Sequence, residues 1–176
     1  TSGYNSVTNG FLRDSLKMTL DFLEEDKIQM VHYPDFFEEG YKHKHDKDIY
    51  HYLDSVASDN QYQMNRGFCH RLLRCSVRIW QFKNLEELKA KYKEVIDVLT
   101  RSYDGEKNTP DLQQLKGMIR EFEEELVWAY NGVQVKNVHH LHLGFYQDSG
   151  VTKGPNMERD VMPILNQFRE IQPNII

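Results

Sequence analysis

Four basic side chains share one edge of a predicted helix in the middle of this chain. They are His70, Arg71, Arg74 and Arg78, within the stretch RGFCHRLLRCSVRIWQFK, residues 66–83. At about 100° per residue, these positions fall within an arc of roughly 100°. The planar guanidinium of arginine pairs with carboxylates and phosphates through parallel hydrogen bonds. The strip therefore predicts a docking edge for an acidic or phosphorylated protein segment.

A second interpretation of this basic strip is structural. Charged runs on helices are usually solvated or paired within the protein, and arginine stems also cover apolar neighbours. The chain offers many carboxylates as internal partners: Glu24, Glu25, Glu38, Glu39, Glu121, Glu123, Glu124 and Glu125. Apolar residues occupy most of the remaining circumference of residues 60–83, which predicts a central, largely buried helix.

Histidines gather at two further places and could bind a metal ion. The first cluster is His43, His45, Asp46, Asp48 and His51, and the second is His139, His140 and His142. Imidazole and carboxylate groups are ligands that suit zinc. Lysines interleaved with the first cluster oppose a cation. The alternative function is therefore a helical metal- or cofactor-binding enzyme that uses residues 43–51 and 139–142, and the leading interpretation expects no metal and no cofactor.

Trp128 is a candidate partner contact on a different helix. It falls on the polar face, near Glu121, Glu124 and Glu125, while Phe122 faces inward. Tryptophan often anchors protein interfaces. The alternative is that another segment, such as the histidine-rich loop, covers its ring.

The two cysteines do not suggest nucleophilic catalysis. Cys69 precedes His70, but adjacent helical residues do not face one another. Cys69 and Cys75 would point about 120° apart on a helix, so they cannot form a disulfide there. Unpaired thiols and the absence of an Asn-x-Ser/Thr acceptor are typical of a reducing compartment. We expect a cytoplasmic protein.

Apolar periodicity and capping residues predict an all-α fold. Five or six helices are expected, within the ranges 9–26, 46–57, 60–83, 84–103, 110–130 and 155–171. The helices at 84–103 and 110–130 are joined by a short polar connection, which favours an antiparallel hairpin. Residues near 133–146 alternate weakly and predict a short β-hairpin or an extended loop. We expect a single helical domain over residues 1–176, either complete or part of a longer protein.

Composition narrows the classes of function. The chain has 176 residues, enough for one core, and its formal net charge of -5 argues against a nucleic-acid or anionic-membrane binder. No apolar run reaches the length of about 18 residues that a membrane span needs. The leading prediction is a non-enzymatic, intracellular protein-interaction or scaffold domain with a protein partner. Its oligomeric state is left open.

Overall fold

The computed structural model describes residues 4–39, 46–103, 105–143 and 154–174. The chain divides into two compact units, Gly3–Val138 and His139–Ile176 with Thr1–Ser2. That residues 1–176 form one domain stays a prediction.

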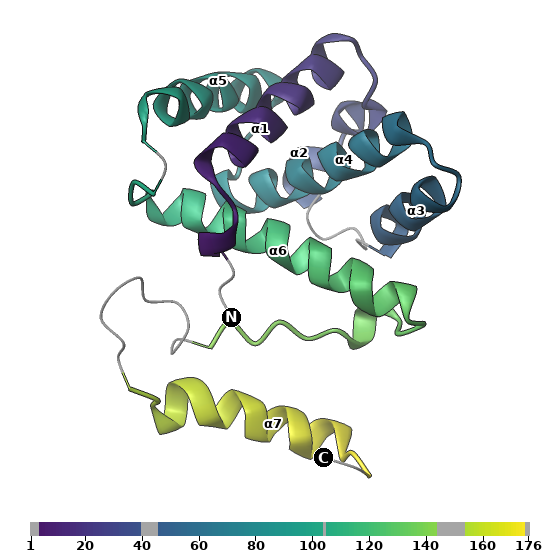
Figure 1. Ribbon diagram of the computed structural model, residues 1–176, viewed down its shortest axis with the longest axis vertical. Coiled ribbons are helices and arrows are strands. Elements are labelled where there is room, and N and C mark those ends of the chain that lie inside the picture. Colours follow the sequence, from purple (N-terminus) through teal and green to yellow (C-terminus); the bar gives the residue numbers. More distant parts are fainter. Residues whose placement is uncertain (1–3, 40–45, 104, 144–153, 175–176) are drawn as a thin grey trace. The chain divides into compact units, whose positions relative to one another are not determined.

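The all-α class is confirmed, because the described residues contain helices and no strand. The larger unit contains, in chain order, η1 (Tyr4–Ser6), α1 (Asn9–Glu24), η2 (Gln29–His32), α2 (Phe36–Glu39), α3 (Asp46–Ala57), α4 (Gln61–Trp80), α5 (Leu85–Arg101), α6 (Pro110–Tyr130) and η3 (Val135–Asn137) (Figure 1). Residues 133–143 form η3 and irregular chain. The remainder of the segment expected at 133–146 lies outside the described residues.

Helix α4 lies at the centre of the larger unit, as its two apolar faces predict. It packs against α1, α3 and α6. Its middle section is almost completely buried, including Cys69, Leu72, Leu73, Cys75 and Val77. Three neighbouring helices therefore surround the helix that carries the basic strip.

Asparagine side chains cap α4 and α5, whereas Thr109, in the cap position of α6, makes no side-chain cap hydrogen bond. The side chain of Asn60 accepts a hydrogen bond from the backbone of Gln63 at 3.1 Å, and that of Asn84 accepts one from Glu87 at 2.9 Å. In a capping box, the side chain of Glu87 would accept a hydrogen bond from the backbone N–H of Asn84. Here its Oε2 accepts instead from the backbone N–H of Lys83, one residue earlier, at 2.9 Å. These caps fix where α4 and α5 begin.

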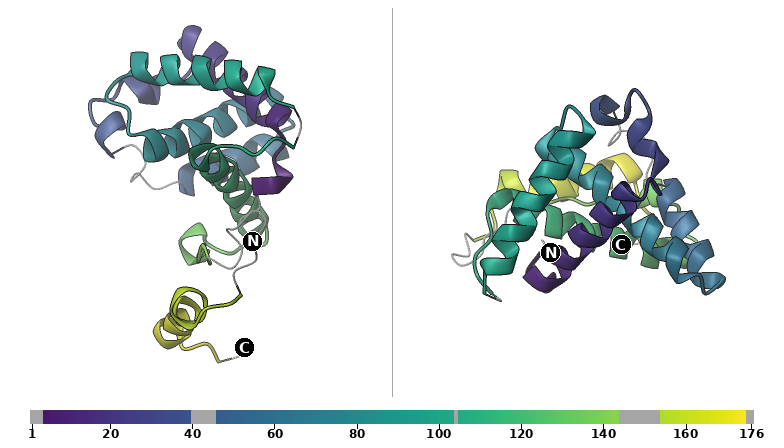
Figure 2. Two further views of the ribbon diagram at one scale, coloured as in Figure 1. Left: turned by 90° about the vertical axis from the view of Figure 1, so that its left-hand side faces the viewer. Right: turned by 90° about the horizontal axis from the view of Figure 1, so that it is seen from above.

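The predicted antiparallel hairpin of α5 and α6 is wrong. Helix α5 packs against α1, whereas α6 packs against α3, α4 and η1 (Figures 1 and 2). The physical reason lies in α1, which buries Leu12, Leu16, Leu20 and Leu23 and so offers α5 an apolar surface from outside the local sequence. A short connection between two helices therefore does not make them packing partners here.

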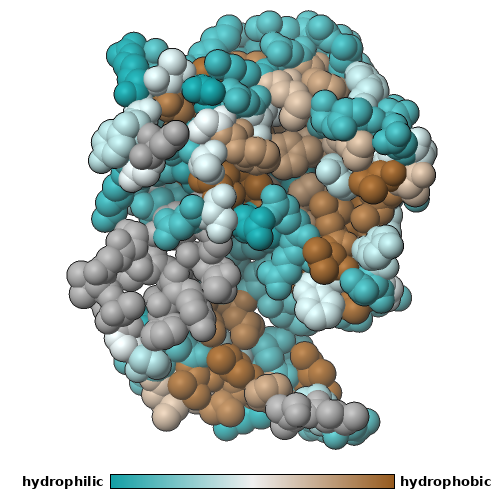
Figure 3. All heavy atoms as spheres, in the orientation of Figure 1, coloured by the Kyte–Doolittle hydropathy of each residue, from teal (hydrophilic) through white to brown (hydrophobic). Residues whose placement is uncertain are grey.

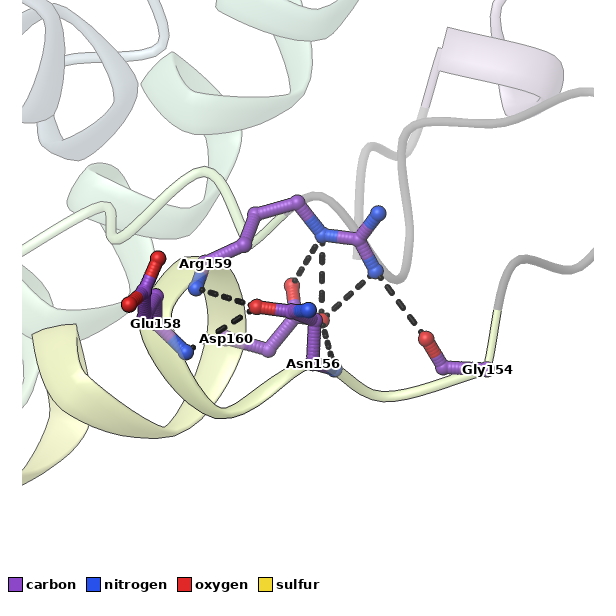
Figure 4. Close-up of polar contacts among 5 residues, drawn as sticks. All are labelled: Gly154, Asn156, Glu158, Arg159 and Asp160. Atoms are coloured by element: carbon purple, nitrogen blue, oxygen red, sulfur yellow. Dashed lines mark hydrogen bonds and ion pairs between the residues drawn. The ribbon is translucent and has the colours of Figure 1, made fainter.

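The smaller unit contains a π-helical turn (Met157–Val161) followed by α7 (Met162–Ile171). The Asn156 side chain accepts from the backbone N–H groups of Glu158 and Arg159 at 3.0 and 3.1 Å. Asp160 Oδ2 accepts from the backbone of Asn156 at 2.8 Å, so the cap is reciprocal (Figure 4). The irregular turn runs directly into α7 and precedes Pro163, whose missing N–H cannot bond a carbonyl of the preceding turn.

Candidate interaction surfaces

Arg71 of the basic strip lies inside the protein. Its Nη2 is 3.1 Å from Oε1 and 3.0 Å from Oε2 of Glu125, and the two side chains are 6% and 9% exposed. The guanidinium also lies over the ring of Phe122, 5.5 Å from its centroid. Arg71 therefore links α4 to α6, and its charge is matched within the fold.

Arg74 is also paired inside the larger unit. Its Nε donates to Oδ2 of Asp48 at 2.7 Å, linking α4 to α3. Burial raises the pKa of the Asp48 carboxyl group, and the attraction of Arg74 offsets only part of that effect. Both Arg71 and Arg74 are thus paired within the protein, as the structural interpretation of the strip expects. The partner of Arg74 is Asp48, which the sequence had grouped with the first histidine cluster.

The other two members of the strip differ from each other. His70 is partly buried, and burial, followed by the charges of Arg66 and Arg74, lowers its pKa to about 4. Its Nε2 is buried without a hydrogen-bond partner among the described residues. Arg78 is exposed. Of the four strip residues, Arg78 alone presents its charge to solvent.

Trp128 is exposed on α6, as its position on the helix predicts. The exposed fractions are 60% for Val127, 46% for Trp128 and 81% for Tyr130. We call these three residues the Trp128 surface. Figure 3 shows hydrophobic side chains gathered on the face that carries α3 and the adjoining part of α6. Single exposed apolar residues are ordinary, whereas three within four positions make this end of α6 a candidate contact region.

The histidines of the alternative interpretation fall in different parts of the chain. His43 and His45 lie outside the described residues, His51 is exposed on α3, and His139, His140 and His142 belong to the smaller unit. The rings of His140 and His142 lie 6.4 Å apart. No group of three or more potential metal ligands occurs among the residues whose positions are described.

Both cysteines are free and buried in α4. Burial raises the pKa of each thiol to about 11. Thiols of this kind are largely protonated at neutral pH and react poorly. The assignment of both residues to packing fits this environment.

One charged contact was not anticipated from the sequence. Lys116 is 5% exposed, and its Nζ donates to Oδ1 of Asn9 at 2.7 Å. Burial lowers the pKa of Lys116, and no carboxylate pairs with it among the described residues. The sequence carried one signal of this burial. Lys116 follows Leu112 by four residues and precedes Ile119 by three, which places it on the apolar face of α6.

Comparison with known proteins gives one partial match. Over 97 residues, the chain is 36% identical to a protein of Bacteroides thetaiotaomicron described as glucosamine-6-phosphate deaminase-like. The match covers 54% of this chain and 15% of that protein. No family model matches the chain, and no solved structure matches it. Among the described helices, none combines the length and apolar character that crossing a bilayer requires.

Proposed function

We propose that this chain is a non-enzymatic, intracellular protein-interaction or scaffold domain that binds another protein through the Trp128 surface. The observation that carries the proposal is the exposure of Trp128, at 46%, between the still more exposed Val127 and Tyr130. Aromatic anchors of this kind supply much of the binding energy in protein interfaces. The helices beneath this surface are held by the Arg71–Glu125 pair, so the contact residues rest on a fixed support.

The basic strip contributes less to the proposed binding than the Trp128 surface. An acidic or phosphorylated ligand would have to break the pairs of Arg71 with Glu125 and of Arg74 with Asp48 to reach those guanidinium groups. Opening a buried pair leaves an uncompensated charge and costs about 3 to 5 kcal/mol. Arg78 remains for such a ligand, and His70 is largely neutral near pH 7 with its pKa lowered to about 4. The main contact is therefore assigned to Trp128.

The test is a selection of binding peptides. Random 16-residue peptides displayed on phage are selected on the wild-type chain, and the recovered clones are measured on Trp128→Ala. We expect clones whose affinity falls at least tenfold on Trp128→Ala. The matched control is Tyr103→Ala, because Tyr103 is 71% exposed elsewhere in the larger unit. Clones that bind Trp128→Ala as well as the wild type, or no clones at all, would contradict the proposal.

The partial match favours a second candidate. The matched 97 residues are 15% of a protein described as glucosamine-6-phosphate deaminase-like. This chain would then act as a helical portion of a larger protein that handles an amino-sugar phosphate. Calorimetric titration with glucosamine 6-phosphate distinguishes the candidates. Saturable binding would support the second candidate, and the absence of heat up to millimolar ligand would favour the first.

A further inference from the structure

The dipeptide Asn-Gly occurs twice in this chain, at residues 9–10 and at residues 131–132. Asparagine followed by glycine is chemically labile, because glycine has no Cβ to shield its own backbone nitrogen. That nitrogen can attack the side-chain carbonyl carbon of the asparagine. The fold decides whether either pair reaches the geometry that this reaction needs.

Asn9 is held in an unreactive environment. It is 4% exposed and is the first residue of α1, so Gly10 lies within regular helix. Its Oδ1 accepts a hydrogen bond from Nζ of Lys116 at 2.7 Å, and its Nδ2 donates to the backbone oxygen of Tyr103 at 3.4 Å. Both ends of its amide group are therefore fixed inside the larger unit.

Asn131 has the opposite environment. Asn131 and Gly132 are exposed and directly follow the last residue of α6. A Cβ added to Gly132 would meet no atom within 4 Å, so nothing covers this turn. The ends of helices also open more readily than their centres. The second Asn-Gly pair is therefore accessible both to solvent and to local opening.

The cap that holds Asn131 is built on the carbonyl groups of the Trp128 surface. Asn131 Nδ2 donates to the backbone oxygen of Val127 at 2.8 Å, and the backbone N–H of Val133 donates to that of Trp128 at 3.0 Å. Gly132 has a φ of 84°, as is common just after a helix. The ψ of Asn131 is 11°, which turns the Gly132 nitrogen away from the Asn131 side chain. Ring closure therefore requires the cap to open first.

We propose that Asn131 is a site of spontaneous deamidation whose product opens the last turn of α6, which carries the Trp128 surface. The Gly132 nitrogen loses its proton and bonds to Cγ of Asn131, while the Nδ2 group takes up a proton and leaves as ammonia. Water then opens the cyclic imide at either carbonyl and gives aspartate or isoaspartate.

The product should weaken the cap for an electrostatic reason. The Nδ2 group donates to the oxygen of Val127, and the reaction replaces it with a carboxylate. A negative charge is unfavourable at the C-terminal end of a helix, where the backbone carbonyls already carry partial negative charge. The inference does not depend on the proposed function, because no partner takes part in the reaction.

The test compares the two asparagines within one sample. The wild-type chain is incubated at pH 8 and 37 °C, and tandem mass spectrometry of tryptic peptides locates the mass gain that conversion to aspartate or isoaspartate produces. We expect Asn131 to react at least tenfold faster than Asn9. In guanidinium chloride the two rates should agree within threefold, because both pairs then react without the protection of the fold.

The variant Asn131→Asp supplies the aspartate product directly. We expect the backbone N–H groups of residues 131–133 to exchange with solvent deuterium at least threefold faster in this variant than in the wild type. The matched control is Asn137→Asp, which adds the same charge at an exposed position of η3 and should leave this exchange unchanged.

Equal rates at Asn9 and Asn131 in the folded chain would overturn the inference. It would also be overturned if Asn131 stays intact in the folded chain after the unfolded chain has reacted. Unchanged exchange in Asn131→Asp would show that the product does not open the helix end. The proposed function is decided separately, by the library selection on freshly prepared wild-type chain.

Discussion

Arg71 and Glu125 form a buried ion pair that joins α4 to α6, with Nη2 3.0 Å from Oε2. Taking these two charges out of water is costly, and their attraction compensates only while both are present. A packing of α4 on α6 that separated the two side chains would leave each charge buried and unpaired, so the pair favours the faces that meet here. It also explains why a basic residue on the predicted docking strip is closed to solvent.

Removing one partner of this pair should destabilise the fold. We expect Arg71→Met or Glu125→Gln to lower the free energy of unfolding by about 3 to 5 kcal/mol, because the remaining polar group stays buried without its partner. The double variant Arg71→Met with Glu125→Leu should recover most of the loss. Urea unfolding followed by circular dichroism measures all three. A single-variant loss below about 1 kcal/mol would show that the pair is open in solution.

Charge reversal should destabilise the fold at Arg74 and have little effect on stability at Arg78. Arg74→Glu places a second carboxylate beside Asp48, whose side chain is 6% exposed, so we expect a loss of about 3 to 5 kcal/mol. Arg78→Glu changes an exposed residue and should alter stability by less than about 0.5 kcal/mol. Thermal melting of the two variants under the same conditions gives the comparison. Equal losses would mean that Arg78 also has a structural role.

His70 should make the protein less stable in mild acid. Its pKa in the folded state is lowered to about 4, so the unfolded chain, with a histidine pKa of about 6.5, binds more protons between these values. Stability from this residue is complete above about pH 6.5 and is lost as the pH falls towards 4.

The measurement is the free energy of unfolding of the wild type and His70→Gln across this range. The difference between them should show the uptake of close to one proton on unfolding near pH 5. An unchanged slope in His70→Gln would place the histidine in contact with solvent.

Asn9 should stabilise the fold by accepting the hydrogen bond of Lys116. The Nζ of Lys116 donates to Oδ1 of Asn9 at 2.7 Å in a buried position. Asn9→Ala should cost about 1 to 3 kcal/mol, because the ammonium group loses this acceptor. Lys116→Met alone removes the buried charge, so the pair Asn9→Ala with Lys116→Met should be more stable than Asn9→Ala. Chemical unfolding of the set tests the coupling, and simple additivity would refute it.

The helices themselves were largely predictable because their signals are local. Asn60 and Asn84 cap α4 and α5 as their sequence contexts indicate, and Pro110 and Asn131 bracket α6. The central position of α4 followed from its two apolar faces. The place of Trp128 on the polar side of α6 was also predictable, whereas only the structure shows that its ring stays 46% exposed.

The partners of those helices were decided by tertiary structure. Helical periodicity put Arg71, Arg74 and Arg78 on one edge. It could not show that α6 brings Glu125 to Arg71 and that α3 brings Asp48 to Arg74. The short connection between α5 and α6 likewise predicted that they pair, whereas α5 lies against α1. The sequence by itself determined where helices form and which faces are apolar, because those depend on neighbours within a turn or two. Which face meets which depends on residues far apart in the chain, such as Lys116 and Asn9, and is settled only when the helices pack.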